Sequence, residues 1–397
     1  MNKSSYLSLY YIFLILSMLY MCRQLTLWGF YRDLIPLFRW SATLLAVPVF
    51  AYSMPKYEGN KPLLICLIGF LVFLAGYNSE NITVLLLSFT MVVGAKGVLF
   101  RDIIRVHFIF GLCFCLFNIV GRELDLIPKT NLIRGNEREG TLGDIVARED
   151  FGYGFPTDFA LHVFYILLDY WILKNRRLRW LEVLVYIYLA YFVIRYSDAR
   201  LAAICILLIV ILSFVSPLFQ KRAFCFRYII IPFFIICIPL FAMISIGATI
   251  MYDDTDFYWI GADLLFSGRL HLGQDAMQEA GISLFGQTYT MYGMGNLGVG
   301  DEYNYIDCSY LQSLVFWGVF LTVILVLLFA KICKSASICR DFILLSAVFV
   351  AGISGIIAQF FYFLAYCPLL IALTAQLQDN DANESFPEPL PHSEFES

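Results

Sequence analysis

Two arginines stand at the starts of predicted helices. Arg200 ends the run YSDAR and leads directly into an apolar stretch, while Arg269 lies near the start of the run RLHLG. A guanidinium group stays charged and binds phosphate oxygens in pairs, and a helix that starts at Arg269 would add a preference for anions. The two residues therefore predict a catalytic site for a diphosphate or other anion, with Arg195 as a nearby substrate-binding residue. The alternatives are an interfacial anchor paired with Asp198 and an ordinary surface arginine.

Four side chains are candidates for a general base. Asp158 and His162 stand four residues apart in an apolar stretch, so they share one face of the expected helix. Ionisable residues within such a stretch are energetically costly and usually face a cavity or a partner. A buried hydrogen-bonded pair that fixes helix packing is the equal alternative. Asp198 and His271 are the other candidates, and the sequence leaves the choice among the four open.

A polar interval at 252–307 is the longest break between the apolar stretches. It ends in a tyrosine-rich run in which Tyr303, Tyr305 and Tyr310 are candidates for stacking on a substrate, and Asp307 completes this substrate-binding set. Tyrosines are also common at membrane interfaces, which is the alternative interpretation.

No metal or cofactor is expected. Asp254 and Asp256 have a spacing that suggests a metal–nucleotide site, but their position just before a predicted helix favours helix capping. No zinc signature or phosphate-binding glycine loop is present in the sequence.

Composition predicts how these residues are held. The 397 residues are 60% hydrophobic and only 15% charged, which favours an all-α, polytopic integral membrane protein. About 12 transmembrane helices are expected, with a large extracytoplasmic loop that contains two short helices at 257–266 and 269–280. The candidate membrane spans are 6–22, 34–54, 62–77, 81–95, 103–120, 153–173, 181–195, 200–218, 228–251, 308–330, 342–358 and 361–377.

The distribution of Lys and Arg predicts the orientation. The residues in KNRRLR at 174–179 are the densest cluster, and they place that loop in the cytoplasm together with both termini. Loops 121–150 and 252–307 then lie outside. We expect one membrane domain at 1–378 in the cell membrane, followed by a disordered, acidic cytoplasmic tail at 379–397.

Several short motifs occur in an order that resembles a known family. They are FGYGFP (151–156), YSDAR (196–200), SGRL (267–270) and SLFGQ (283–287), followed by the tyrosine-rich run. This order resembles bacterial polysaccharide polymerases of the Wzy type, including those that make O-antigen, capsule and exopolysaccharide. The resemblance covers about the central half of the chain. The sequence departs from relatives that have His-Pro-Asn in the first motif, because this chain has Phe155-Pro156-Thr157.

The resemblance implies a metal-independent glycosyltransferase without cofactors. Such enzymes join oligosaccharide repeat units carried on undecaprenyl diphosphate at the outer membrane face, and outer-face arginines matching Arg200 and Arg269 take part. The implied partners are the lipid-linked oligosaccharides, membrane lipid and other polysaccharide-assembly proteins, and no nucleic acid. Two other interpretations stay open: a lipid-linked saccharide ligase or other outer-face glycosyltransferase, and a lipid-linked oligosaccharide flippase or other transporter. A transporter fits the number of spans, but its charges commonly line a mid-membrane pathway.

Overall fold

The protein is a helical bundle. The computed structural model describes residues 2–24, 26, 28–128, 132–134, 146–221, 231–266, 268–293 and 303–377, so the predicted acidic tail lies outside the described residues. Within them, the strands are two of three residues each, β1 (Leu132–Arg134) and β2 (Val146–Arg148), which pair in an antiparallel ribbon. The long helices are α1 (Lys3–Met21), α2 (Gly29–Ser53), α3 (Lys61–Asn78), α4 (Ile82–Gly94), α5 (Phe100–Glu123), α6 (Pro156–Lys174), α7 (Trp180–Ser197), α8 (Arg200–Lys221), α10 (Ile231–Ile250), α14 (Gly318–Ile338) and α15 (Phe342–Ile357).

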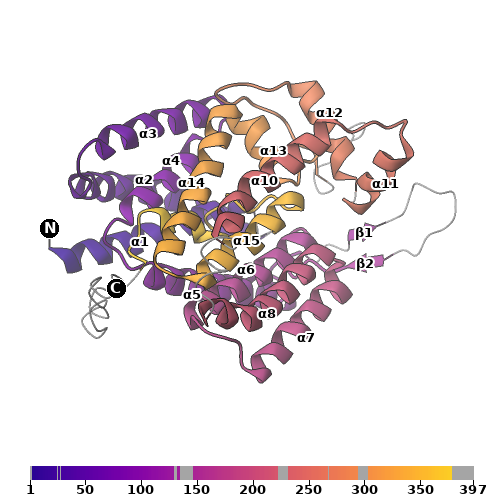
Figure 1. Cartoon of the computed structure of the whole chain (residues 1–397), viewed down its shortest axis with the longest axis horizontal. Coiled ribbons are helices and arrows are strands. Elements are labelled where there is room, and N and C mark those ends of the chain that lie inside the picture. The colour runs from indigo at the N-terminus through magenta and orange to yellow at the C-terminus, as the bar shows by residue number, and fades with distance from the viewer. Residues whose placement is uncertain are drawn as a thin grey trace, which may run out of the picture.

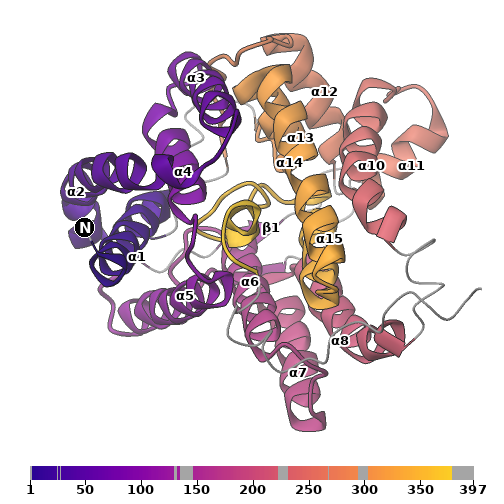
Figure 2. The ribbon, with the colours of Figure 1, turned by 60° about the vertical axis from the view of Figure 1, so that its left-hand side comes forward.

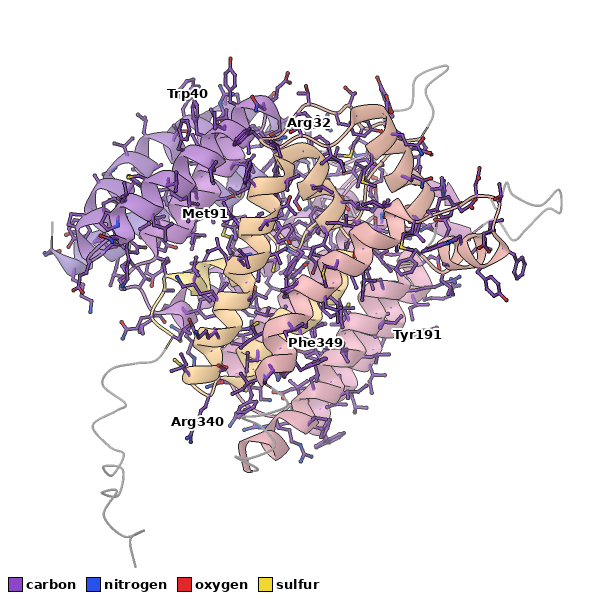
Figure 3. The ribbon with its side chains drawn as sticks, turned by 45° about the horizontal axis from the view of Figure 1, so that its top comes forward. Arg32, Trp40, Met91, Tyr191, Arg340 and Phe349 are labelled. Atoms are coloured by element: carbon purple, nitrogen blue, oxygen red, sulfur yellow. The ribbon has the colours of Figure 1, made fainter. Side chains whose placement is uncertain are left out.

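The exterior of the bundle is apolar. Among the described residues, seven helices are long and apolar enough to cross a membrane, and three further apolar helices are shorter. Large apolar side chains cover the outside, including Leu63 and Leu44, and Trp40 and Tyr191 point away from the bundle (Figure 3). An exposed apolar surface of this extent would be unfavourable in water. The fold is therefore compatible with a multi-pass membrane protein.

The connections between helices gather at two ends. At the first, the Lys56 ammonium lies 3.6 Å from the Tyr6 ring and donates to the Lys96 carbonyl at 3.2 Å, while Gln376 pairs with Leu99. We call this the terminal end, because α1 begins there (Figure 1). The β1–β2 ribbon and two short helices, α11 (Phe257–Leu265) and α12 (Arg269–Ala280), lie at the opposite end, which we call the ribbon end.

Helix α6 is the centre of the bundle. It packs against α5, α7, α8 and α15, and most of its residues are buried. Figure 2 shows it in the middle of the molecule, beside the C-terminal segment. Because protein surrounds α6, its polar residues Asp158, His162 and Asp169 face other side chains and not lipid.

The predicted helix at 361–377 is wrong. After α15, residues 358–377 fold as turns and a short 3₁₀ helix (Pro368–Leu373), and most of them are buried. The segment runs from the ribbon end, where Ala358 accepts from Ser309, to the terminal end at Gln376. Pro368 explains the lack of an α-helix, since it has no N–H and forces Cys367 out of the helical region. We call residues 358–377 the irregular crossing.

The predicted span at 308–330 is interrupted. It consists of α13 (Ser309–Gln312), a π-helical turn (Ser313–Trp317) and α14. The outer segment SLFGQ docks on the break: Gln287 N–H bonds the Phe316 carbonyl at 3.0 Å, and Val319 N–H bonds the Ser283 carbonyl at 3.0 Å. Gly318, with φ of +83°, allows this close approach. The motif therefore joins the outer segment to the bundle.

The two short helices occur where the sequence predicted them. Asp256 caps α11 by accepting from the Tyr258 N–H at 2.8 Å, and α12 ends at Gly281. Asp253 accepts from the Thr255 backbone N–H at 2.9 Å and hydroxyl at 2.7 Å. The acidic run therefore organises local backbone, as the capping interpretation proposed.

Candidate functional site

Arg269 is the first residue of α12, and a buried carboxylate fixes its position. Gly268 precedes it with φ of +79°. Asp263, on α11 and 1% exposed, accepts from the backbone N–H groups of Leu270 at 2.8 Å and His271 at 3.3 Å, and bonds the His271 Nδ1 at 2.8 Å. These bonds join α11 to α12 as one unit that presents Arg269. His271, a predicted base, is therefore held by Asp263.

The guanidinium of Arg269 is only partly satisfied. Its Nη2 lies 2.9 Å from the Asp307 carboxylate, and its Nη1 donates to the Phe266 carbonyl at 3.3 Å. Its Nε is buried without a hydrogen-bond partner among the described residues. The ion pair therefore uses one edge nitrogen and leaves N–H donors for another acceptor. The side chains of Arg269 and Asp307 are 19% and 24% exposed, so the pair can be reached from outside.

Asp158 lies beside this ion pair. It stands in the first turn of α6, is 6% exposed, and its carboxylate forms no hydrogen bond or ion pair with the described residues. The carboxylates of Asp158 and Asp307 are close enough to repel each other, and Asp158 also acts electrostatically on Tyr305. Leaving a buried carboxylate without a partner is energetically costly. Such a group is typical of a binding or catalytic site.

Arg148 is a site residue that the sequence analysis missed. It ends strand β2, and its Nε donates to the Ser197 carbonyl at 2.9 Å. It also acts electrostatically on Asp307 and Tyr303. The site therefore has two arginines, one on α12 and one on the ribbon. The position of Arg148 in a long polar loop was the available signal, but this loop holds several basic residues and nothing local distinguishes them.

Two tyrosines line the same site. Burial raises the pKa of Tyr303 and Tyr305 above the ordinary value, so both are neutral hydrogen-bond donors. Burial also raises the pKa of Asp307, although Arg269 and Arg148 act in the opposite direction. We call Arg269, Arg148, Asp158, Asp307, Tyr303 and Tyr305 the Arg269 cluster.

Two predicted site residues lie in the core and outside the cluster. His162 is 3% exposed, its Nε2 lies 3.1 Å from the Gly111 carbonyl, and its ring packs against Tyr366. Tyr310 is fully buried, and its hydroxyl donates to the Gly352 carbonyl at 3.0 Å. Neither side chain presents a free surface to a sugar or a phosphate.

Three further predicted residues lie at the turn between α7 and α8. Asp198 ends α7 in the left-handed region, with φ of +48°, and Arg200 is 82% exposed with its Nε 3.6 Å from the Asp198 carboxylate. Arg195 is exposed and lies over the Tyr196 ring. The structure therefore places Arg148, and not Arg200, in electrostatic contact with Asp307. The bond from Arg148 to the end of α7 nevertheless connects this turn to the cluster.

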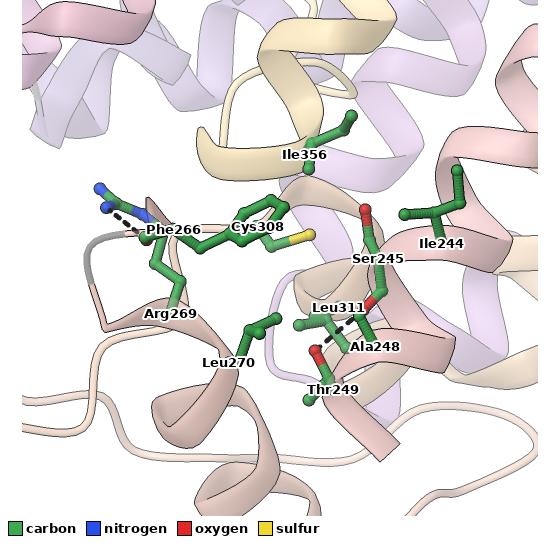
Figure 4. Close-up of a pocket in the computed structure, with 10 residues that line it drawn as sticks. All are labelled: Ile244, Ser245, Ala248, Thr249, Phe266, Arg269, Leu270, Cys308, Leu311 and Ile356. Carbon is green, nitrogen blue, oxygen red and sulfur yellow. Dashed lines mark hydrogen bonds between the residues drawn. The ribbon is translucent and has the colours of Figure 1, made fainter. Parts of the chain in front are cut away.

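A narrow apolar crevice reaches Arg269. Figure 4 shows its lining from α10, α12, α13 and α15, with the guanidinium at one end and the residues of α10 at the other. Ile244 and Leu270 are among its apolar walls, and Ile244 is 47% exposed on the outside of the bundle. The cationic group is therefore adjacent to surface that an apolar chain can cover.

The chemistry available to the cluster is anion binding beside a carboxylate that can accept a proton. In the described part of the chain, no three His, Cys, Asp or Glu side chains gather as metal ligands would. No protein-family model, curated protein or solved structure matches this chain. The function must therefore be argued from the site itself.

Proposed function

We propose that the protein polymerises undecaprenyl-diphosphate-linked oligosaccharide repeat units into a surface polysaccharide at the outer face of the cell membrane. In this proposal the ribbon end faces outside, both termini are cytoplasmic, and the chain crosses the membrane about 12 times, with the irregular crossing as the last passage. The order of motifs that resembles Wzy-type polymerases supports this topology and this reaction.

The observation that carries the proposal is that Arg269 and Asp158 both lie beside Asp307. Arg269 has unused N–H donors next to an apolar crevice, which suits a diphosphate attached to a lipid. Asp158 is a buried carboxylate without a partner in the described residues, which suits a sugar hydroxyl that must lose a proton. Both side chains interact with Asp307, so the diphosphate-binding group and the proton-accepting group lie beside each other.

The reaction follows from these positions. A hydroxyl oxygen of the acceptor sugar attacks the anomeric carbon of the donor, and its proton passes to the Asp158 carboxylate. The new C–O bond forms as the bond from the anomeric carbon to the diphosphate breaks, and the electron pair leaves with the undecaprenyl diphosphate. Arg269, assisted by Arg148, stabilises the negative charge that develops on this leaving group.

The test replaces Arg269 in a strain that lacks the native gene. Loss of a charged donor that stabilises a transition state typically slows a reaction about 10²–10³-fold. We therefore expect Arg269→Ala to abolish long glycan chains on a gel, while single repeat units still reach the surface. Retention of these units separates a polymerase from a flippase, whose loss would leave the surface without them.

A matched control is available at the terminal end. Arg105 also forms an ion pair with an aspartate, Asp102, at 2.6 Å, but its side chain is 56% exposed. Arg105→Ala should leave chain length unchanged, because exposed ion pairs contribute little. Native glycan ladders from Arg269→Ala, at equal protein level in the membrane, would refute the proposed site.

A further inference from the structure

Three neutral polar side chains form a connected group beside the Arg269 cluster. The Tyr305 hydroxyl donates to the Gln359 Oε1 at 2.6 Å, and the Gln312 Nε2 donates to the same oxygen at 3.3 Å. All three side chains are only partly buried. We call them the amide group.

The amide group adjoins Asp158. Tyr305 interacts electrostatically with both Asp158 and Asp307. Gln359 lies near the start of the irregular crossing, between Ala358, whose carbonyl accepts from Ser309 at 3.2 Å, and Tyr366, whose hydroxyl reaches the Asp158 carbonyl at 3.4 Å. The crossing therefore holds Gln359 in place on the acceptor side of the proposed reaction.

The hydrogen bonds leave a defined set of unused groups. The Gln359 Oε1 already accepts twice, so its Nε2 remains as a donor of two N–H groups. The Gln312 Oε1 remains as an acceptor, and neither atom has a partner within the described residues. A donor and an acceptor in adjacent positions match the two roles of a sugar hydroxyl.

We propose that Gln359, Gln312 and Tyr305 form the acceptor subsite and that it takes an uncharged sugar. This inference rests on the proposed function, because it assigns the acceptor side of the same site. The carboxylate of an acidic sugar would add a negative charge next to Asp158 and Asp307, and both arginines of the Arg269 cluster already act on Asp307. The hydroxyls of a neutral sugar are bound by the amides and directed toward Asp158.

The experiment measures binding of simple glycosides to the full-length protein in lipid nanodiscs. Methyl β-D-glucopyranoside and methyl β-D-galactopyranoside are compared with methyl β-D-glucuronopyranoside at equal concentration by saturation-transfer NMR. We expect transfer to a neutral glycoside and not to the glucuronoside. Gln359→Leu, and the isosteric Gln359→Glu, should weaken the neutral signal about tenfold, because each removes the Nε2 donors.

The matched control is Gln287→Leu. Gln287 is a partly buried amide at the ribbon end that donates to the Gly281 carbonyl at 2.9 Å, outside the amide group. The Gln287→Leu variant should leave the saturation-transfer signals of the neutral glycosides unchanged. Equal transfer to the glucuronoside, no transfer to either neutral glycoside, or native transfer with Gln359→Glu would each overturn the subsite.

Failure of the subsite and failure of the proposed function are distinguishable. If Arg269→Ala abolishes glycan chains but Gln359 variants bind glycosides normally, only the subsite is wrong. If the strain that lacks the native gene makes normal chains without any added copy, the proposed function is wrong, whereas loss of glycoside binding in Gln359→Glu still establishes the sugar site.

Discussion

Replacing Asp158 by Asn should stabilise the protein while stopping the proposed glycosyl transfer. The carboxylate is 6% exposed and lacks a hydrogen-bond partner in the described residues, and Asp307 repels it. Burying an unpartnered neutral amide costs about 1–3 kcal/mol and burying an ionised carboxylate costs several kcal/mol, so the isosteric amide removes a difference of about 1–3 kcal/mol. At about 2.1 cal/mol/K of unfolding entropy per residue, a gain of this size raises the Tm by roughly 1–4 °C. Function and stability would then oppose each other at this residue.

The matched control lies on the same helix. Asp169 is also buried but is paired with His107, whose Nδ1 lies 2.5 Å from its carboxylate. Removing one partner of a buried pair costs about 3–5 kcal/mol, so Asp169→Asn should lower the Tm. The assay is thermal unfolding in one detergent at pH 8, followed by tryptophan fluorescence, together with glycan chain length in cells. A lower Tm for Asp158→Asn would refute the reasoning, because it would show that Asp158 is a structural residue.

Two further predictions concern the ion pair and the helix break. Asp307→Asn should tighten binding of farnesyl diphosphate about tenfold, because a net charge-assisted hydrogen bond of about 1.5–3 kcal/mol no longer competes for Arg269. Because burial raises the pKa of Asp307, native binding should strengthen as pH falls through that raised pKa, where the carboxyl becomes neutral. Calorimetric titration of both proteins from pH 8 to pH 5 checks this, and the same pH dependence in Asp307→Asn would contradict it. Gly318→Ala should lower the amount of folded protein strongly, since the Cβ would lie 2.7 Å from the Leu284 carbonyl oxygen at φ +83°. Gly247→Ala, where no atom lies within 4 Å of the added Cβ, is the control, and equal yields by fluorescence size exclusion would argue against the tight contact.

Local signals predicted the parts of the fold that local physics decides. The all-α class, the apolar exterior and the two short helices after residue 256 are confirmed, because hydropathy and capping residues such as Asp256 act within a few residues. The prediction of a helix at 361–377 was wrong because Pro368 interrupts the segment, and its buried aromatic side chains pack in the core from irregular backbone. Nothing in a hydropathy run distinguishes a buried irregular segment from a helix.

The site was less predictable because it depends on distant contacts. Arg269 and Asp307 both stood among the candidates, but their ion pair joins residues on different elements. Asp158 and His162 share a helix face, yet four residues separate them by about 6 Å along the axis. Asp158 therefore lies in the Arg269 cluster, whereas His162 packs against Tyr366 in the core. Arg148 reaches Asp307 because it lies on the β1–β2 ribbon, and no sequence pattern indicates where this ribbon packs.

The irregular crossing has a consequence for how the protein is made. A segment without regular helical hydrogen bonds is not stable in lipid by itself, so it enters after the surrounding helices have formed a protein-lined path. Residues 358–377 follow all these helices in the order of synthesis. Gln359 therefore reaches the side of Asp158 only when nearly the whole described chain has been translated. Ribosome-bound intermediates that end before residue 358 would carry Arg269 and Arg148 without Gln359, so the proposed site would be completed only at the end of synthesis of the described chain.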